Sequence, residues 1–237
     1  MIHRLLKLLF PSLCLLCGYL DEPLCRRCQA VLPFEPHVRV ISDFKVASAC
    51  FYEPDSLLAK LVHGLKYQHQ ADVYRYFAPT LRRSLELFWD PSSVILVPVP
   101  LHRARLLERG YNQSELLAKT MGAYFGVPVM NLLERQKDTG HQAQLSQEAR
   151  AENMQSVFRV RPYMKNAVLG SSQILLVDDI VTTGCTLLAC RDALRENGAT
   201  FIAALTLADR ALQKNSDRNR RLTQLPPKTH GGGTLQH

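Results

Sequence analysis

The segment with the clearest chemical potential pairs two carboxylates with a turn rich in hydroxyl groups. An apolar run at 173–177 ends in Asp178 and Asp179, and the stretch 180–186 that follows contains three threonines and one glycine. An unbroken apolar run is typical of a strand buried on both faces of a parallel sheet. Helical spacing at 187–195 and a further apolar run at 201–207 then predict a strand–helix–strand unit of the α/β class.

The position of the acid pair indicates what this unit could bind. Ligands of such sheets lie beyond the carboxyl ends of the strands, where Asp178 and Asp179 are placed. Backbone N–H groups at the start of the following helix favour an anion. Carboxylates beside an anion site would repel a bare phosphate. They fit a sugar phosphate that also carries free hydroxyl groups and a divalent metal ion, which carboxylates can bind. The residues of the turn are Ile180, Val181, Thr182, Thr183, Gly184, Cys185 and Thr186.

Other phosphate-binding motifs are excluded at this turn. The P-loop requires a glycine–lysine pair and the dinucleotide-binding fingerprint requires three spaced glycines, and 180–186 has neither. An acid pair that merely caps a strand at the surface is the alternative, which the attached threonine-rich turn disfavours.

Four cysteines near the N-terminus have the spacing of a metal site. Cys14 and Cys17 form one Cys-x-x-Cys pair, and Cys25 and Cys28 form a second pair. Two such pairs can aim four thiolates at one zinc ion, and a closed site with four protein ligands is structural rather than catalytic. Two disulfides, an iron–sulfur cluster or plain core cysteines are the alternatives.

The other three cysteines lie in apolar stretches, at Cys50, Cys185 and Cys190. We expect each to be a small buried residue rather than a reactive thiol. Cys185 differs from the other two because it falls inside the expected phosphate turn.

A second expected strand, at 93–100, is followed by basic residues. Its closing prolines stop the strand and shape the next loop. That loop begins near Pro100 and carries Arg103 and Arg109. Its basic composition suits the binding of a diphosphate. The alternative is a basic surface turn with no ligand. Helices are expected at 114–125 and 57–67. Lys66, near the end of the latter, could reach a diphosphate or act only as a C-terminal cation.

Composition and charge narrow the function classes. The chain has 237 residues, of which 46% are hydrophobic and 21% charged, which excludes a mostly disordered or fibrous protein. The formal net charge is +8, and half of this excess lies in residues 211–237. We expect that segment to be a disordered basic tail, because its few apolar residues cannot offset the entropy of ordering.

The N-terminus begins like a secretory signal but departs from one. Pro11 breaks the apolar run, and Cys14 and Cys17 stand where a cleavage site would be expected. The uncharged stretch 8–20 is too short for a membrane-spanning helix, which needs about 20 residues. We therefore expect a short amphipathic helix ahead of the cysteines, no membrane span and a cytoplasmic protein.

The turn after the acid pair resembles the phosphoribosyl-diphosphate loop of type I phosphoribosyltransferases. With the other motifs, the chain resembles the ComF family of competence-associated phosphoribosyltransferase-like proteins, which includes the GntX-type DNA-utilisation proteins. The resemblance covers about 10–210 and does not include the tail. Besides the cysteines, it rests on 63–67 (His-Gly-Leu-Lys-Tyr), 97–100 (Val-Pro-Val-Pro), 109–113 (Arg-Gly-Tyr-Asn-Gln) and 178–186, and on Thr139, Gln142, Leu145, Arg150 and Asn153 in a polar lid candidate at 135–153.

The resemblance implies a ligand and a biological role. Asp178 and Asp179 would contact the ribose hydroxyls of phosphoribosyl diphosphate bound with Mg²⁺, and Thr182 to Thr186 would cradle its 5′-phosphate. The role implied is DNA uptake, natural transformation or DNA utilisation, with a competence helicase and DNA-processing proteins as partners.

Two function hypotheses follow. One is a phosphoribosyltransferase enzyme, and the other is an accessory protein that senses phosphoribosyl diphosphate or binds single-stranded DNA. Aromatic residues near basic ones could stack on DNA bases, although we expect them in the core. These residues are Tyr67, Tyr74, Tyr76 and Phe77.

The predicted architecture therefore has three parts. A zinc module at 1–40 precedes a type I phosphoribosyltransferase-like α/β domain at 45–210, in which helices flank a parallel sheet. The basic tail at 211–237 follows.

Overall fold

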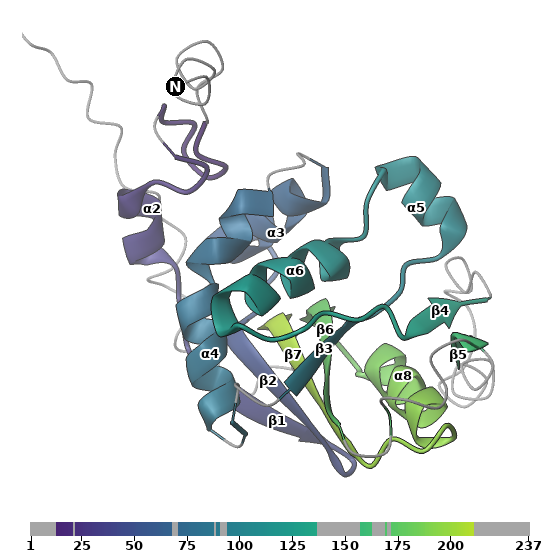
Figure 1. Cartoon of the computed structure of the whole chain (residues 1–237). Helices are drawn as coiled ribbons and strands as arrows, with labels where there is room; N and C mark the ends of the chain where they lie inside the picture. Colours follow the sequence, from purple (N-terminus) through teal and green to yellow (C-terminus); the bar gives the residue numbers. More distant parts are fainter. Residues whose placement is uncertain are drawn as a thin grey trace, which may run out of the picture.

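A computed structural model of the chain describes residues 13–20, 22–67, 71–87, 89–90, 94–136, 157–162, 169 and 172–210. In these ranges a five-stranded sheet with the order β1-β2-β7-β6-β3 occupies the centre (Figure 1). Its parallel strands are β2 (Phe44–Phe51), β7 (Phe201–Asp209), β6 (Gln173–Val181) and β3 (Val94–Pro98). β1 (His37–Ile41) pairs antiparallel with β2 at one edge. The α/β class with a mainly parallel sheet is confirmed.

Helices lie on both faces of the sheet (Figure 1). α3 (Leu57–Tyr67), α4 (Ala78–Glu86) and α6 (Gln113–Phe125) cover one face, and α8 (Cys185–Arg195) covers the other. A small antiparallel sheet of β4 (Leu133–Arg135) and β5 (Phe158–Val160) lies beside α8. The shorter helices are α2 (Arg26–Val31), η1 (Ala71–Tyr76) and α5 (Arg103–Arg109).

The apolar run of β6 accounts for its position in the sheet. Leu175 and Val177 pack in the core on the α6 side, whereas Ile174 and Leu176 pack in the core on the α8 side. Successive side chains of a strand point to opposite faces, so burial of both faces requires an unbroken apolar run. The run ends at Asp178, where β6 reaches the edge of the two cores.

β6 is longer at its carboxyl end than the sequence predicted. Ile180 and Val181, which we expected in the turn, continue the strand and pair with Ala208 and Asp209 of β7. β-branched residues favour extended structure, and β7 supplies the pairing that keeps them in the sheet. The turn before α8 therefore begins at Thr182.

The basic segment after β3 forms a helix rather than the expected loop. His102 caps the start of α5 by accepting a hydrogen bond from the backbone N–H of Ala104, and Gly110 ends the helix with a φ of 76°. No residue of α5 is buried. The other two predicted helices are confirmed, at 57–67 and, with one residue more, at 113–125.

The cysteine segment packs against the domain. Cys14, Cys25 and Cys28 share a core with buried leucines of α3. β1, which belongs to the sheet, lies across the predicted boundary between 40 and 45. Of the helices in the described ranges, none has the length and apolar character needed to cross a membrane.

Replacement by alanine should have opposite effects on stability at two glycines that lie in helices. A Cβ at Gly122 in α6 would lie 2.5 Å from Val129 Cγ2 and 3.0 Å from the carbonyl oxygen of Val127. A Cβ at Gly64 in α3 would meet Leu15 at an ordinary 3.5 Å. Gly122→Ala should therefore lower the free energy of unfolding by about 1–3 kcal/mol. Gly64→Ala should leave it unchanged or raise it by up to about 1 kcal/mol.

Urea unfolding of the two variants and the wild-type protein measures the difference. A Gly122→Ala variant as stable as the wild-type protein would contradict the close packing of α6 on the segment 127–129.

Candidate functional site

A small polar pocket lies where β6 passes into α8. Asp178, Ile180, Val181, the turn Thr182 to Thr186 and Leu187 line it, and it is open to solvent. Gly184 makes the turn possible because its φ of 86° lies in the left-handed region that other residues avoid. α8 starts directly at Cys185, so the first N–H groups of the helix belong to the pocket wall.

Asp178 is the acid that enters this pocket. One of its carboxylate oxygens, Oδ1, accepts hydrogen bonds from Ser114 Oγ at 2.8 Å and from the backbone N–H of Asp179 at 2.9 Å. Ser114 lies in the first turn of α6. The carboxylate is thus fixed from the helix layer that covers the sheet, and a second oxygen remains for a ligand.

Burial of the carboxyl group and, to a lesser extent, the neighbouring charge of Asp179 together raise the pKa of Asp178 to about 7. The hydrogen bonds from Ser114 and from the backbone N–H of Asp179 act in the opposite direction. Strongly shifted acids in a pocket are frequent in functional sites. A cation at this position would offset the repulsion between the two acids, and the hydroxyl groups of a ligand could donate hydrogen bonds to the carboxylate oxygens.

Asp179 has a different orientation from Asp178. Its Oδ1 accepts a hydrogen bond from the backbone N–H of Ile180 at 2.8 Å, and it is not among the residues that line the pocket. The two acids are adjacent as the sequence requires, but within the described residues only Asp178 faces the turn.

The segment 109–114 anchors the start of α6. Tyr111 donates its hydroxyl hydrogen to the carbonyl of Leu65 at 2.6 Å. Asn112 donates from Nδ2 to the carbonyl of Val99 at 2.9 Å, while its Oδ1 accepts the N–H of Ser114 at 3.1 Å and caps the helix. Ser114 was not predicted as a site residue. An asparagine before the expected helix is a signal for the helix start, but not for a contact between Ser114 and Asp178.

The predicted diphosphate residues lie outside the pocket wall. Pro100 follows β3, which is the parallel neighbour of β6, so its loop leaves the same edge of the sheet. Arg103 is exposed at the start of α5, and Arg109 Nη1 lies 3.5 Å from Gln113 Oε1. The side chain of Lys66 lies outside the described residues, as do residues 137–153 of the lid candidate and the tail.

The four N-terminal cysteines converge on one point. Their Sγ atoms all lie within 4.8 Å of one another, and those of Cys17 and Cys25 are 3.7 Å apart. Around zinc, with bonds of about 2.3 Å, tetrahedral sulfurs would lie roughly 3.8 Å apart. All seven cysteines of the chain are free, so the two-disulfide alternative is not what the structure shows. The cluster can hold a metal ion.

The thiol pKa values show why this cluster favours a cation. Burial raises the pKa of Cys28, and the neighbouring sulfurs of Cys17 and Cys25 raise it further. Burial also acts to raise that of Cys14, but N–H groups of Cys25, Cys17 and Leu16 outweigh it and lower the pKa to about 7. Four thiolates therefore need a positive ion to coexist in this space.

The remaining cysteines divide into two groups. Cys50 and Cys190 are buried as expected, and burial raises the pKa of each thiol. The expectation of a buried residue is wrong for Cys185, which is exposed because it occupies the first position of α8 in the pocket wall.

Comparison of the sequence with known proteins shows the family of this chain. The domain family described as "Phosphoribosyl transferase domain" matches residues 112–227. Competence protein F of Haemophilus influenzae is 31% identical over 166 residues, which are 67% of this chain and 69% of that protein. The chain belongs to the ComF family. A ComF-family relative from Salmonella typhi, DNA utilization protein YhgH, is 30% identical over the same shares of both chains.

A solved structure is also similar to this ComF-family chain. It is titled as the allosteric regulatory enzyme of purine biosynthesis, with 17% sequence identity and a TM-score of 0.40, over 61% of this chain and 30% of that one.

The match to the phosphoribosyl transferase domain family extends to residue 227. This is beyond the predicted domain end at 210 and beyond the described residues.

Asp178→Asn should stabilise this ComF-family protein increasingly as the pH rises. The pKa of Asp178 is raised from 3.8 to about 7 in the folded protein. Folding therefore takes up a proton in this window, and the wild-type protein loses stability as the pH rises through it. The amide stays neutral and can still accept from Ser114 Oγ. The gain in the free energy of unfolding of Asp178→Asn over the wild-type protein should be small near pH 4. It should reach a few kcal/mol near pH 8, on the order of 1.4 kcal/mol for each unit of pKa shift.

Thermal or urea unfolding across this range measures the effect, with Asp72→Asn as the control at an exposed carboxylate. A constant difference between Asp178→Asn and the wild-type protein at all pH values would contradict the burial of this carboxyl group.

Proposed function

We propose that this ComF-family chain binds phosphoribosyl diphosphate together with Mg²⁺ in the pocket between β6 and α8. The observation that carries the proposal is the placement of Asp178 in the same pocket wall as the turn Thr182 to Thr186. One ligand could then meet a carboxylate at its ribose hydroxyls and backbone N–H groups at its 5′-phosphate.

The residues around the pocket fit the rest of this ligand. Asp179 is the second acid for the ribose. The segment after β3, with Pro100, Arg103 and Arg109, is assigned to the diphosphate together with Lys66. The parallel pairing of β3 and β6 supports this assignment because both strands deliver their following segments to one edge. Mg²⁺ would neutralise the charge of the diphosphate when bound.

The proposed biological role is DNA uptake, natural transformation or DNA utilisation. It is supported by relatives named competence protein F and DNA utilization protein YhgH. A competence helicase and DNA-processing proteins are the proposed partners. Within this role, the chain either transfers the phosphoribosyl group to an acceptor or only senses the ligand. Diphosphate release across a panel of nitrogenous bases distinguishes the enzyme from the sensor.

Titration calorimetry with phosphoribosyl diphosphate and Mg²⁺ tests the binding proposal. Asp178→Asn and Asp179→Asn should each weaken binding about tenfold or more, because a hydrogen bond to a charged group contributes about 1.5–3 kcal/mol. Asp192→Asn, which alters an exposed carboxylate on α8, is the control. Wild-type protein that fails to bind, or acid variants that bind equally well, would refute the proposal.

We also propose that the four-cysteine cluster holds a structural zinc ion. Its support is the convergence of four sulfur atoms from two Cys-x-x-Cys pairs, three of them buried in the core shared with α3. Zinc at this point would tie the N-terminal segment to the domain.

Metal analysis by mass spectrometry tests the zinc proposal. The wild-type protein should carry one zinc ion per chain, and Cys14→Ser should lose it and unfold at a lower temperature. Cys185→Ser, at an exposed thiol far along the sequence, should keep the metal. Stoichiometric zinc retained by Cys14→Ser would remove the assignment.

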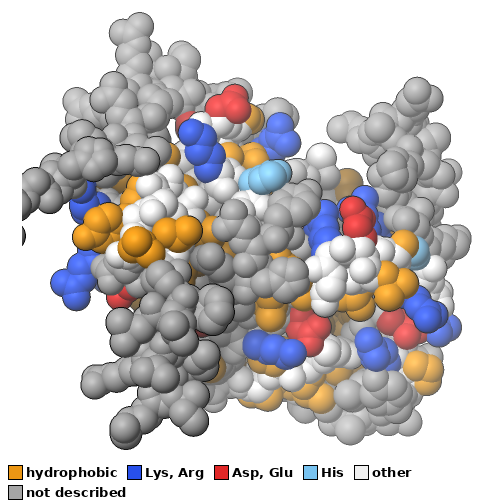
Figure 2. Space-filling view, turned by 90° about the horizontal axis from the view of Figure 1, so that it is seen from above, with side chains coloured by type: hydrophobic (Ala, Val, Ile, Leu, Met, Phe, Trp, Pro, Cys, Tyr) orange, Lys and Arg blue, Asp and Glu red, His pale blue; other side chains and the backbone are white. Residues whose placement is uncertain are grey.

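A second candidate function, binding of single-stranded DNA, has one favourable observation. α5 exposes Arg103 and has no buried residue, so the helix is accessible to phosphates. Tyr74 and Phe77 are buried, as expected, and so cannot stack on bases. Among the residues coloured in Figure 2, basic side chains are spread between acidic and hydrophobic ones rather than joined in one patch.

The salt dependence of binding tests this candidate. If α5 contacts phosphates, the affinity for single-stranded DNA should fall steeply with salt, and Arg103→Ala should reduce the log–log slope by about 0.7. A flat slope in the wild-type protein would exclude the phosphate contacts.

A further inference from the structure

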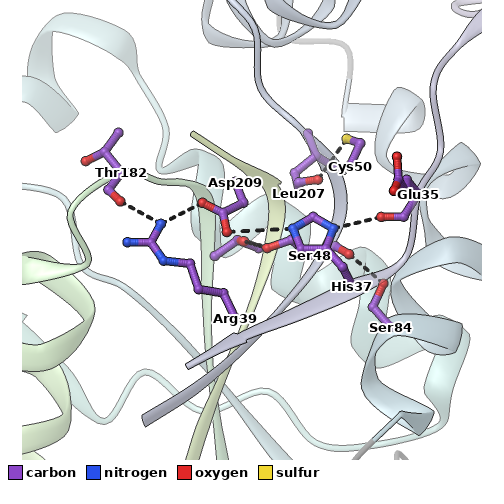
Figure 3. Close-up of polar contacts among 10 residues, drawn as sticks. Glu35, His37, Arg39, Ser48, Cys50, Ser84, Thr182, Leu207 and Asp209 are labelled. Atoms are coloured by element: carbon purple, nitrogen blue, oxygen red, sulfur yellow. Dashed lines mark hydrogen bonds and ion pairs between the residues drawn. The ribbon is translucent and has the colours of Figure 1, made fainter. Parts of the chain in front are cut away.

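The turn that forms the pocket is held from its outer side by the edge strand β1 (Figure 3). Arg39 of β1 donates from Nη1 to the carbonyl oxygen of Thr182 at 2.9 Å. The same nitrogen donates to Asp209 Oδ1 at 2.8 Å. One guanidinium group therefore links the first residue of the turn to the end of β7.

Asp209 fixes the position of this guanidinium group. It is the last residue of β7 and is 1% exposed, so its carboxylate depends on protein partners. Arg39 contacts one oxygen, and His37 Nε2 lies 3.6 Å from the other. The His37 ring is itself held, because it stacks on Phe51 and its Nδ1 lies 2.8 Å from the carbonyl oxygen of Glu35. Both partners of the buried acid thus come from β1.

A second side chain of β1 contacts the turn. Ile41 lies two residues after Arg39, and alternate residues of a strand share a face. A Cβ added to Gly184 would lie 2.5 Å from Ile41 Cδ1, so the backbone of Gly184 packs directly on this side chain. β1 therefore holds the turn at Thr182 through a hydrogen bond and at Gly184 through packing.

The contact at Thr182 has a geometric consequence for the next residue. The described peptide bonds are all trans, and in a trans peptide the C=O and the following N–H point in opposite directions. Because Arg39 fixes the Thr182 carbonyl toward β1, the N–H of Thr183 must point away from β1. Thr183 belongs to the pocket wall.

We propose that Arg39 is a positioning residue for the phosphate-binding turn. It acts through the Thr182 carbonyl to present the N–H of Thr183 to a phosphate, and it does not itself contact the ligand. Asp209 orients Arg39 for this task. The inference rests on the proposed function for its ligand, but the effect on the turn exists without any ligand.

Two measurements on the full chain test the proposal. NMR order parameters report the rigidity of the Thr183 to Thr186 N–H groups in the free protein, and calorimetry reports affinity for phosphoribosyl diphosphate with Mg²⁺. The variants are Arg39→Met, Asp209→Asn and the double variant. Arg82→Met is the control, because Arg82 forms an exposed ion pair with Glu86 on α4.

The expected result has three parts. The order parameters of the turn should fall from about 0.85 to below about 0.6 in both single variants and remain unchanged in Arg82→Met. Each single variant should bind about tenfold more weakly. The double variant should bind no more weakly than either single one, because both substitutions break the same linkage.

Other outcomes overturn the proposal. If Arg39 contacted the ligand directly, Asp209→Asn would free the guanidinium group and leave the affinity unchanged or improved. An Arg39→Met variant with a rigid turn also contradicts the inference, and Asp209→Asn decides the question if Arg39→Met does not fold. A third outcome separates the two proposals. If the order parameters fall in the variants as expected but the wild-type protein binds no ligand, the proposed function is refuted and the positioning role of Arg39 remains.

Discussion

A partly buried carboxylate at the end of a buried strand is the constraint on which this structure depends. Asp178 reaches the pocket because β6 is apolar on both faces up to that residue. The cost of its burial is offset by Ser114 Oγ and the backbone N–H of Asp179, both on Oδ1. Ser114 can donate only if α6 starts at one place, so the start of this helix is as important to the site as the turn itself.

The motifs that carry the family resemblance meet around that helix start. Tyr111 binds the carbonyl of Leu65, and Asn112 binds the carbonyl of Val99, so segments from α3, from the end of β3 and from α6 are fastened together. In the described residues these contacts join one part of the domain to another. They fix the start of α6, from which Ser114 holds Asp178, whereas the turn and its N–H groups supply the surface for an anion. The cysteine cluster extends the same scaffold, since its buried sulfurs share a core with α3.

Much of this could be predicted from the sequence, because the signals were local. An unbroken apolar run predicted β6, helical spacing predicted α3 and α6, and paired cysteines predicted the metal cluster. Ser114, Arg39 and Asp209 could not be predicted, because their partners lie 64, 143 and 170 positions away and leave no pattern in the chain. The length of β6 was misjudged for the same reason: its pairing with β7 decides whether Ile180 and Val181 extend the strand.

A crystal structure of the complex with phosphoribosyl diphosphate and Mg²⁺ is the most direct test of the proposed site. The ribose hydroxyls should lie within hydrogen-bond distance of the acid pair at the end of β6, and the 5′-phosphate should lie against the N–H groups of Thr183 to Thr186. A ligand bound elsewhere on the chain, or a sugar turned so that its hydroxyls face away from Asp178, would contradict it.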